Sequence, residues 1–252
     1  MFAVDFGAPA GASFPSWCLQ KDESSTAQIR SRLPMMQIRC DWGLCNRLEV
    51  LFSFLGEARQ KGEEIVWIWK NNVPCPGDFL DCFEPIDGVK IVSSGEGDCL
   101  FSGWMPLAPE NEQLLRDCLK PRPAIVDAVA RWRSSLDHDY IALHVRRTDL
   151  ALHMQQFGQD ISGYERAYCF VEQFPPATRI FLAADNAESQ QLFKDRYGAR
   201  VFFKPIIPSD SYRQTTLWDA VVDLYVCVGA AKFAGTECST FTKMISILRR
   251  HT

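Results

Sequence analysis

The chain has 252 residues, of which 47% are hydrophobic and 23% are charged, as is ordinary for a globular protein of one large domain or two small ones. Its net charge of −4 argues against a nucleic-acid-binding protein that depends on a broad basic surface. No stretch approaches the roughly 18 apolar residues of a membrane-spanning helix, and the first residues lack the pattern of a signal peptide.

The ten cysteines include no Cys-x-x-Cys pair, and several lie in apolar segments, among them Cys169 and Cys227. We therefore expect reduced thiols that pack as small hydrophobic groups, and a reducing compartment such as the cytoplasm. A disulfide in the N-terminal half, for example between Cys75 and Cys82, is the alternative.

The predicted elements begin after a lead-in. Residues 1–34 are rich in Gly, Ala, Ser and Pro and show no hydrophobic period, so we expect a poorly ordered segment. From residue 36 onward, segments typical of buried strands alternate with segments of helical spacing. In chain order, the first half is predicted to contain a strand (36–40), a helix (46–60), two strands (64–70 and 89–93) and a helix (110–118).

Three residues, Pro121, Arg122 and Pro123, interrupt this alternation and form the predicted linker. In the second half we predict helices over 124–134, 162–173, 187–196, 215–228 and 239–250, and strands over 140–145, 179–184, 199–203 and 232–235. Alternating strands and helices favour parallel sheets. We therefore predict an α/β protein of GT-B-like type, with two Rossmann-like lobes (35–120 and 121–252) that face a cleft.

Two arginines, Arg146 and Arg147, directly follow a predicted strand. Ligands of open α/β sheets bind at the carboxyl ends of the strands, and a guanidinium fork matches two phosphate oxygens. We therefore predict that the paired guanidinium groups bind a diphosphate. The alternative is a pair of surface arginines that bond to Asp139 and Asp149.

Polar residues follow two more strands of the second half. Ser239 or Thr240 can cap the last helix, whose free N–H groups would bind a phosphate, although the cap can also be structural alone. Asp185 or Asn186 can cap the helix that follows, and either could instead hydrogen-bond a ribose or a base.

In the first half, Gly43, Asn46 and Arg47 join a strand to a helix. A glycine and a capping asparagine at that point indicate a ligand-facing turn, or equally an ordinary connection.

Several motifs are absent. The chain has no Gly-x-x-x-x-Gly-Lys-Ser/Thr and no Gly-x-Gly-x-x-Gly, which argues against a P-loop NTPase and an NAD-binding enzyme. Asp137, His138 and Asp139 have the Asp-x-Asp form of metal-dependent glycosyltransferases. They precede their strand, so we interpret them as a loop and expect no metal site.

The ordered set of motifs resembles the fucosyltransferase superfamily of GT-B fold, over about residues 37 to 250. This superfamily includes α-1,6-fucosyltransferases, bacterial nodulation-factor fucosyltransferases and protein O-fucosyltransferases. The most specific motif is the His-x-Arg-Arg-Thr-Asp string at 144–149. The remaining motifs cover residues 43–48, 67–69, 75–83, 181–185 and 220–224, the last of which contains Asp223, sixteen residues before Ser239.

The resemblance implies that GDP-fucose is the donor and that the C-terminal lobe binds GDP. Arg146 would contact the β-phosphate and stabilise the leaving group, with support from His144 and Arg147. Ser239 and Thr240 would bond to the phosphates.

The remaining roles are also carried by the resemblance. Asp223 would accept hydrogen bonds from the guanine N1 and N2 donors, and Asp185 would lie near the nucleoside. Asn46 and Arg47, with Gly43, would face the donor or the acceptor, which is a hydroxyl of a glycan or a polypeptide. Relatives in the superfamily invert at the anomeric carbon and need no divalent metal.

One departure from the family pattern concerns the general base. The α-1,6 enzymes carry a Lys directly after the Arg-Arg-Thr-Asp run and a Glu a few residues later, whereas residues 150–154 of this chain contain no carboxylate. Asp149, His153 or Asp160 could substitute. The other possible functions are a catalytically inactive GDP-sugar-binding protein of the same fold and an unrelated α/β phosphate-binding protein.

Overall fold

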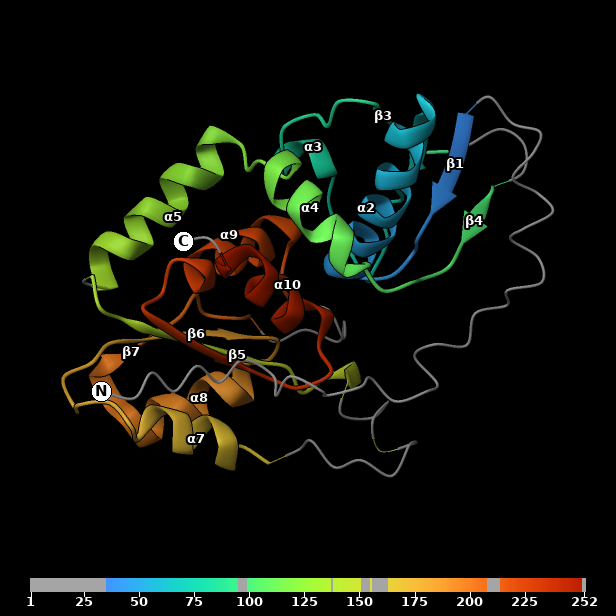
Figure 1. Cartoon of the computed structure of the whole chain (residues 1–252). Helices are drawn as coiled ribbons and strands as arrows, with labels where there is room; N and C mark the ends of the chain where they lie inside the picture. Colours follow the sequence, from blue (N-terminus) through green and yellow to red (C-terminus); the bar gives the residue numbers. More distant parts are fainter. Residues whose placement is uncertain are drawn as a thin grey trace. The chain divides into compact units, whose positions relative to one another are not determined.

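The computed structural model describes residues 35–94, 99–136, 138–150, 155, 163–207 and 214–250 (Figure 1). The chain divides into two compact units between Arg122 and Pro123. The expected disorder of residues 1–34 concerns residues outside this described part, and the cleft between the lobes stays a prediction.

The N-terminal unit is built on a four-stranded sheet in the order β3-β2-β1-β4, in which every neighbouring pair is parallel. Its first two helices lie in connections between strands, and the last two helical segments follow the final strand. The elements are β1 (Met35–Arg39), α2 (Leu44–Lys61), β2 (Glu64–Ile68), α3 (Phe79–Cys82), β3 (Val89–Val92), β4 (Phe101–Ser102), the 3-10 helix η2 (Pro109–Asn111) and α4 (Glu112–Cys118).

The C-terminal unit repeats this topology with a parallel sheet in the order β7-β6-β5-β8. Figure 1 shows α7 and α8 on one face of this sheet and α9 and α10 on the other. The elements are α5 (Pro123–Leu136), β5 (Ile141–Val145), α7 (Glu165–Val171), β6 (Ile180–Ala184), α8 (Ala187–Tyr197), η3 (Gly198–Arg200), β7 (Val201–Phe202), α9 (Leu217–Val228), β8 (Lys232–Gly235) and α10 (Thr240–Arg249).

The two central strands of the C-terminal sheet, β5 and β6, are buried at every position. Helices cover both faces of a parallel sheet, so its central strands carry continuous apolar runs rather than alternating ones. In each sheet the strand order reverses beside the first strand, between β1 and β4 in one unit and between β5 and β8 in the other. The carboxyl ends of these strand pairs are where open α/β sheets bind ligands.

The predicted alternation of parallel strands and helices is confirmed, with shifts of one to three residues at the ends of most elements. Three elements were missed: β4, α3 and η3. Only two residues of β4 pair with β1, which is too short for a periodic pattern. Asn46 was expected to cap α2, but the helix begins two residues earlier, with Gly43 at its N-cap.

Arg47 on α2 has no exposed surface and joins the loops that follow β1 and β2. Its Nε donates to the carbonyl of Trp42, one terminal nitrogen donates to the carbonyl of Lys70, and the other donates to Asn72 Oδ1, all at 2.7 Å. The guanidinium also lies 4.4 Å from the ring centroid of Trp69. A buried guanidinium is costly unless its donors are satisfied, so this network fixes both loops.

The substitution Arg47→Met keeps an unbranched side chain but removes every guanidinium donor. The free energy of unfolding should fall by about 3 kcal/mol, because three acceptors lose a bond from a charged donor. Urea denaturation followed by tryptophan fluorescence measures this loss. The matched control is Arg59→Met on the same helix, since Arg59 is exposed and its guanidinium lies 3.5 Å from the carbonyl of Asp87. Equal losses in the two variants would contradict the assignment.

Candidate functional site

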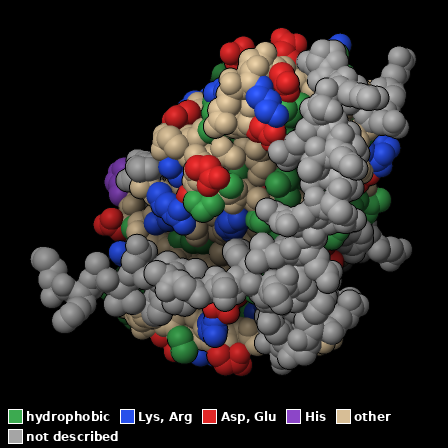
Figure 2. Space-filling model, turned by 45° about the vertical axis from the view of Figure 1, so that its right-hand side comes forward, with side chains coloured by type: hydrophobic (Ala, Val, Ile, Leu, Met, Phe, Trp, Pro, Cys, Tyr) green, Lys and Arg blue, Asp and Glu red, His purple; other side chains and the backbone are tan. Residues whose placement is uncertain are grey.

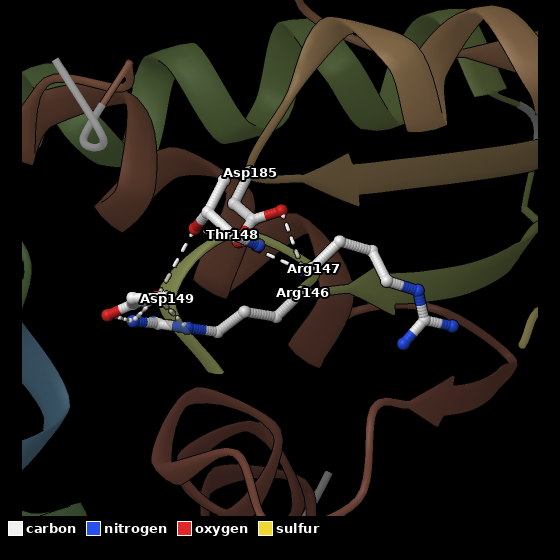
Figure 3. Close-up of polar contacts among 5 residues, drawn as sticks. All are labelled: Arg146, Arg147, Thr148, Asp149 and Asp185. Atoms are coloured by element: carbon white, nitrogen blue, oxygen red, sulfur yellow. Dashed lines mark hydrogen bonds and ion pairs between the residues drawn. The ribbon is translucent and has the colours of Figure 1, made fainter. Parts of the chain in front are cut away.

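The loop after β5 is held by Asp185, the first residue after the neighbouring strand β6. The Asp185 carboxylate accepts the amide of Arg147 at 3.0 and 3.1 Å and the amide of Thr148 at 3.1 Å. It also accepts the Thr148 hydroxyl at 2.7 Å (Figure 3). A carboxylate that accepts several hydrogen bonds fixes the backbone, so Asp185 anchors this loop.

Thr236, the first residue after β8, joins β8 to β5 at the point where the strand order reverses. Its amide donates to the carbonyl of His144 at 2.9 Å, and its hydroxyl lies 3.3 Å from the same oxygen. The same hydroxyl accepts the amide of Arg146 at 3.0 Å. Thr236 was not predicted as a site residue, although its position directly after a strand at the switch point was an available signal.

The Arg146 guanidinium forms an ion pair with Asp149, with nitrogen–oxygen distances of 2.7, 2.8 and 3.2 Å. The Arg146 side chain is 18% exposed, whereas that of Asp149 is 42% exposed. This bond is one of the two that the surface-arginine alternative required. Because the carboxylate is the more exposed partner, an anion from solvent can compete for the guanidinium.

The Arg147 side chain leaves the loop in the opposite direction from that of Arg146 (Figure 3). Its guanidinium lies 4.5 Å from the ring centroid of Tyr164 and donates to the carbonyl of Gly163. The two guanidinium groups therefore do not converge on one anion in this arrangement, unlike the pair that the sequence analysis predicted. Arg146 alone faces the Asp149 side of the loop.

The segment that anchors the Arg147 backbone also supports its side chain. Asn186 caps α8 by accepting the amide of Ser189 at 2.8 Å, as one of the two sequence alternatives proposed. The fully buried Ser189 hydroxyl lies 3.0 Å from the hydroxyl of Tyr164, whose ring stacks against the Arg147 guanidinium. Asp185 thus holds the backbone of Arg147, and Tyr164 holds its side chain.

His144 is a buried residue of β5 that links the strand to α10. Its Nδ1 lies 2.8 Å from the hydroxyl of Thr242, and its ring centroid lies 4.7 Å from that of Phe241. Burial, together with the positive charge of Arg146, lowers the pKa of His144 to about 3, so the imidazole is neutral. A Cβ on Gly235 would come within 2.5 Å of the Thr242 hydroxyl, so glycine at this position allows the close approach.

The N-terminus of α10 lies beside these strand ends. Ser239 is its N-cap and is only 6% exposed, yet its side chain makes no capping bond. The Ser239 hydroxyl has no hydrogen-bond partner among the described residues. Thr240 is the first residue of the helix, and Cys238 before it has a left-handed φ of 61°. The first amides of a helix have no acceptor within the helix, and with a hydroxyl that no described residue pairs they are suited to an anion.

Asp223 lies on α9 with a partly buried side chain. Burial raises the pKa of its carboxyl to about 8, and the nearby charge of Asp219 adds to the rise, while Lys204 opposes it. Within the described ranges, no residue donates a hydrogen bond to this carboxyl. The Asp223 carboxyl can therefore accept hydrogen bonds from the donors of a ligand.

The predicted residues of the N-terminal unit form the start of α2. Gly43 is the N-cap, with extended backbone angles, and Asn46 lies in the first turn. Arg47 was predicted to contact a ligand, but its side chain has no exposed surface.

Four further features bear on the expectations from sequence. The described cysteines, Cys75 and Cys82 included, form no disulfide with one another. In the part of the chain that the structure describes, which omits Asp137, no three His, Cys, Asp or Glu side chains are grouped to hold a metal ion. No described helix is long and apolar enough to cross a membrane. On the face shown in Figure 2, the described basic and acidic side chains are interspersed rather than gathered by sign.

Neither the family models nor the curated proteins give a match to this chain. Several solved structures match the chain. The fucosyltransferase NodZ from Bradyrhizobium matches at a TM-score of 0.60 and 17% identity, over 86% of this chain and 94% of its own.

POFUT1 in complex with GDP matches at 0.59 and 12% identity, over 86% of this chain and 95% of its own. A mutant of Arabidopsis thaliana FUT1 in complex with GDP matches at 0.51 and 12% identity, over 90% of this chain and 72% of its own. The chain therefore has a fucosyltransferase-like α/β fold with two parallel four-stranded sheets.

Proposed function

We propose that the chain is a glycosyltransferase that moves a sugar, L-fucose from GDP-fucose, to a hydroxyl of a glycan or a protein, with inversion and without a metal ion. One observation carries the proposal. Arg146 and the N-terminus of α10, with the unpaired hydroxyl of Ser239, follow β5 and β8 where the strand order reverses. NodZ has been crystallised with GDP and soaked with GDP-fucose, which supports the choice of donor.

In this proposal the diphosphate binds to the N-terminus of α10. The amides of the first turn, the hydroxyl of Ser239 and the hydroxyl of Thr240 donate to the phosphate oxygens. Each hydrogen bond to a charged group contributes about 1.5 to 3 kcal/mol, and the helix dipole adds about 0.3 to 1 kcal/mol. The buried hydroxyl of Ser239 then gains a partner, which none of the described residues provides.

Arg146 stabilises the leaving group. The bond between the anomeric carbon and the β-phosphate oxygen breaks while the acceptor oxygen bonds to the opposite face of the sugar and loses its proton to a base. Negative charge grows on the diphosphate, so a guanidinium that exchanges Asp149 for phosphate stabilises the transition state more than the ground state. Asp149 is the described candidate for the base, whereas His153 and Asp160 lie outside the described residues.

The guanine is assigned to Asp223, whose carboxyl faces no hydrogen-bond donor from the described residues and could accept the N1 and N2 donors of the base. Asp185 acts on the donor indirectly, because it bonds to the loop after β5. His144, neutral and bonded to Thr242, supports the strand end. Gly43 and Asn46, in the N-terminal unit, are assigned to the donor or the acceptor.

A second candidate function is a GDP-sugar-binding protein without transferase activity. The observation that favours it is the stretch 150–154, which has no carboxylate where the α-1,6 enzymes carry a candidate base. The two candidates share the donor site and differ only in the chemical step.

GDP should raise the melting temperature of the protein by several degrees at concentrations far above its Kd, and UDP and ADP should raise it less. Arg146→Ala should weaken GDP binding by about tenfold and lower kcat by about 100-fold, because the developing charge loses its partner. Calorimetry and transfer assays with GDP-fucose measure the two effects. Arg166→Ala, an exposed arginine on α7, is the control.

Normal transfer by Arg146→Ala would contradict the catalytic assignment. GDP binding without transfer to any tested glycan or peptide would favour the second candidate. No effect of GDP on the wild-type protein would remove both.

Tyr164→Leu removes the ring beneath the Arg147 guanidinium and should loosen the loop that carries Arg146. GDP affinity should fall about threefold to tenfold, in line with the strength of a cation–aromatic contact. Tyr164→Phe keeps the ring and should retain most of the affinity. In a double-mutant cycle with Arg147→Ala, the double variant should lose little more than the worse single variant, since both break one contact. Additive losses would show that Tyr164 acts independently of Arg147.

The affinity for GDP should increase from pH 6 to pH 8, because only the ionised Asp223 carboxylate accepts both guanine donors and its pKa is about 8. The increase approaches tenfold per pH unit below the pKa.

The raised pKa of Asp223 also affects stability. The folded protein keeps a proton on this carboxyl that the unfolded chain releases above about pH 4, so the free energy of unfolding without ligand should fall from pH 6 to pH 8. Asp223→Asn should remove both dependences. An unchanged pH profile of GDP affinity in Asp223→Asn would contradict the assignment.

A further inference from the structure

The Arg47 network presents two exposed apolar side chains in the N-terminal unit. Its guanidinium binds the carbonyl of Trp42 and the side chain of Asn72, and Asn72 Nδ2 in turn donates to the carbonyl of Asp41 at 2.9 Å. Each of the two loops joined in this way carries a large apolar residue on the surface. Trp42 and Val73 are both 55% exposed. The loops that satisfy the donors of the buried guanidinium therefore also carry these two exposed side chains.

An ion pair adjoins this apolar surface. Arg39 at the end of β1 bonds to Asp41, and the two side chains are 32% and 35% exposed. The bond to Arg39 lowers the pKa of Asp41, so the carboxylate is ionised at neutral pH. The Asp41 side chain keeps 35% of its surface exposed, so its carboxylate, which already pairs with Arg39, can accept a further hydrogen bond from a hydroxyl at the surface.

This combination matches the chemistry of a sugar ring. A pyranose has an apolar face of C–H groups, which stacks on the electron-rich face of an indole, and an edge of hydroxyls, which bonds to a carboxylate and a guanidinium. The loops are fixed before binding, so little conformational entropy is lost when a ring stacks on the indole. An extended peptide instead requires a long groove or a free strand edge, and a single indole beside an ion pair provides neither.

The position of the surface also favours a ligand. Trp42 follows β1, and β1 is the strand beside which the order of the N-terminal sheet reverses. We propose that Trp42, Val73 and Asp41 form a subsite for one neutral sugar ring of a glycan acceptor. The proposal rests on the proposed transferase function and adds the class of its acceptor, a carbohydrate rather than a polypeptide.

Binding of the full chain, without donor, to an array of purified neutral oligosaccharides tests the subsite. The wild-type protein should bind a subset of the glycans. Trp42→Ala should weaken that binding at least tenfold, and Trp42→Phe should retain part of it, because a smaller aromatic face remains. The matched control is Ile207→Ala, a surface apolar residue of the C-terminal unit that is 82% exposed, and this variant should bind as the wild type does.

Two outcomes overturn the subsite: no binding to any glycan on the array, or binding that Trp42→Ala leaves unchanged. Transfer to a peptide acceptor with the wild-type KM in Trp42→Ala would also overturn it. The Kd for GDP should be the same in all three variants and the wild type. If glycans bind and GDP does not, the transferase function fails while the subsite stands.

Discussion

The hydrogen bonds from the loop after β5 to the Asp185 carboxylate are the constraint on which the candidate site depends. Two consecutive amides and one hydroxyl of the loop converge on this single side chain. Thr236 holds the preceding amide, that of Arg146, from the opposite side of the strand. A backbone fixed at three successive residues sends neighbouring side chains to opposite sides. The Arg146 side chain therefore lies beside Asp149, whereas the Arg147 side chain packs on Tyr164.

The two units use one topology but fix their ligand-side loops by opposite charges. In the C-terminal unit a carboxylate gathers backbone amides, and in the N-terminal unit the buried Arg47 gathers backbone carbonyls. Each device satisfies polar groups that the end of a parallel strand leaves without a ladder partner. The consequence differs as well. The amides bonded to Asp185 belong to the loop that carries Arg146, whereas the carbonyls bonded to Arg47 belong to loops that carry the exposed Trp42 side chain.

The parallel strands and their helices could be predicted because β5 and β6 are buried on both faces, and strands of this kind have mostly apolar sequences. Side-chain roles at the strand ends could not be predicted equally well. An arginine pair has the same residue types whether its members converge or diverge, and the divergence follows from Asp185, 38 residues after Arg147. The roles of Arg47 and Thr236 likewise depend on partners from other strands, which no local pattern specifies. The raised pKa of Asp223 arises from burial that only the packed helix supplies.

The pairing of Arg146 with Asp149 resolves a conflict between stability and function. A guanidinium that is 18% exposed needs a counter-ion, since leaving it unpaired would destabilise the free protein. A fully buried partner would meet that need but would also hold the guanidinium against any substrate. Asp149 is 42% exposed, so water already competes for its oxygens and its bond to Arg146 is weakened by screening. Under the proposed function, a diphosphate, with more negative charge and several acceptor oxygens, would displace Asp149 at small cost. In that proposal the ion pair orients Arg146 before the donor binds and yields the guanidinium to the donor when it arrives.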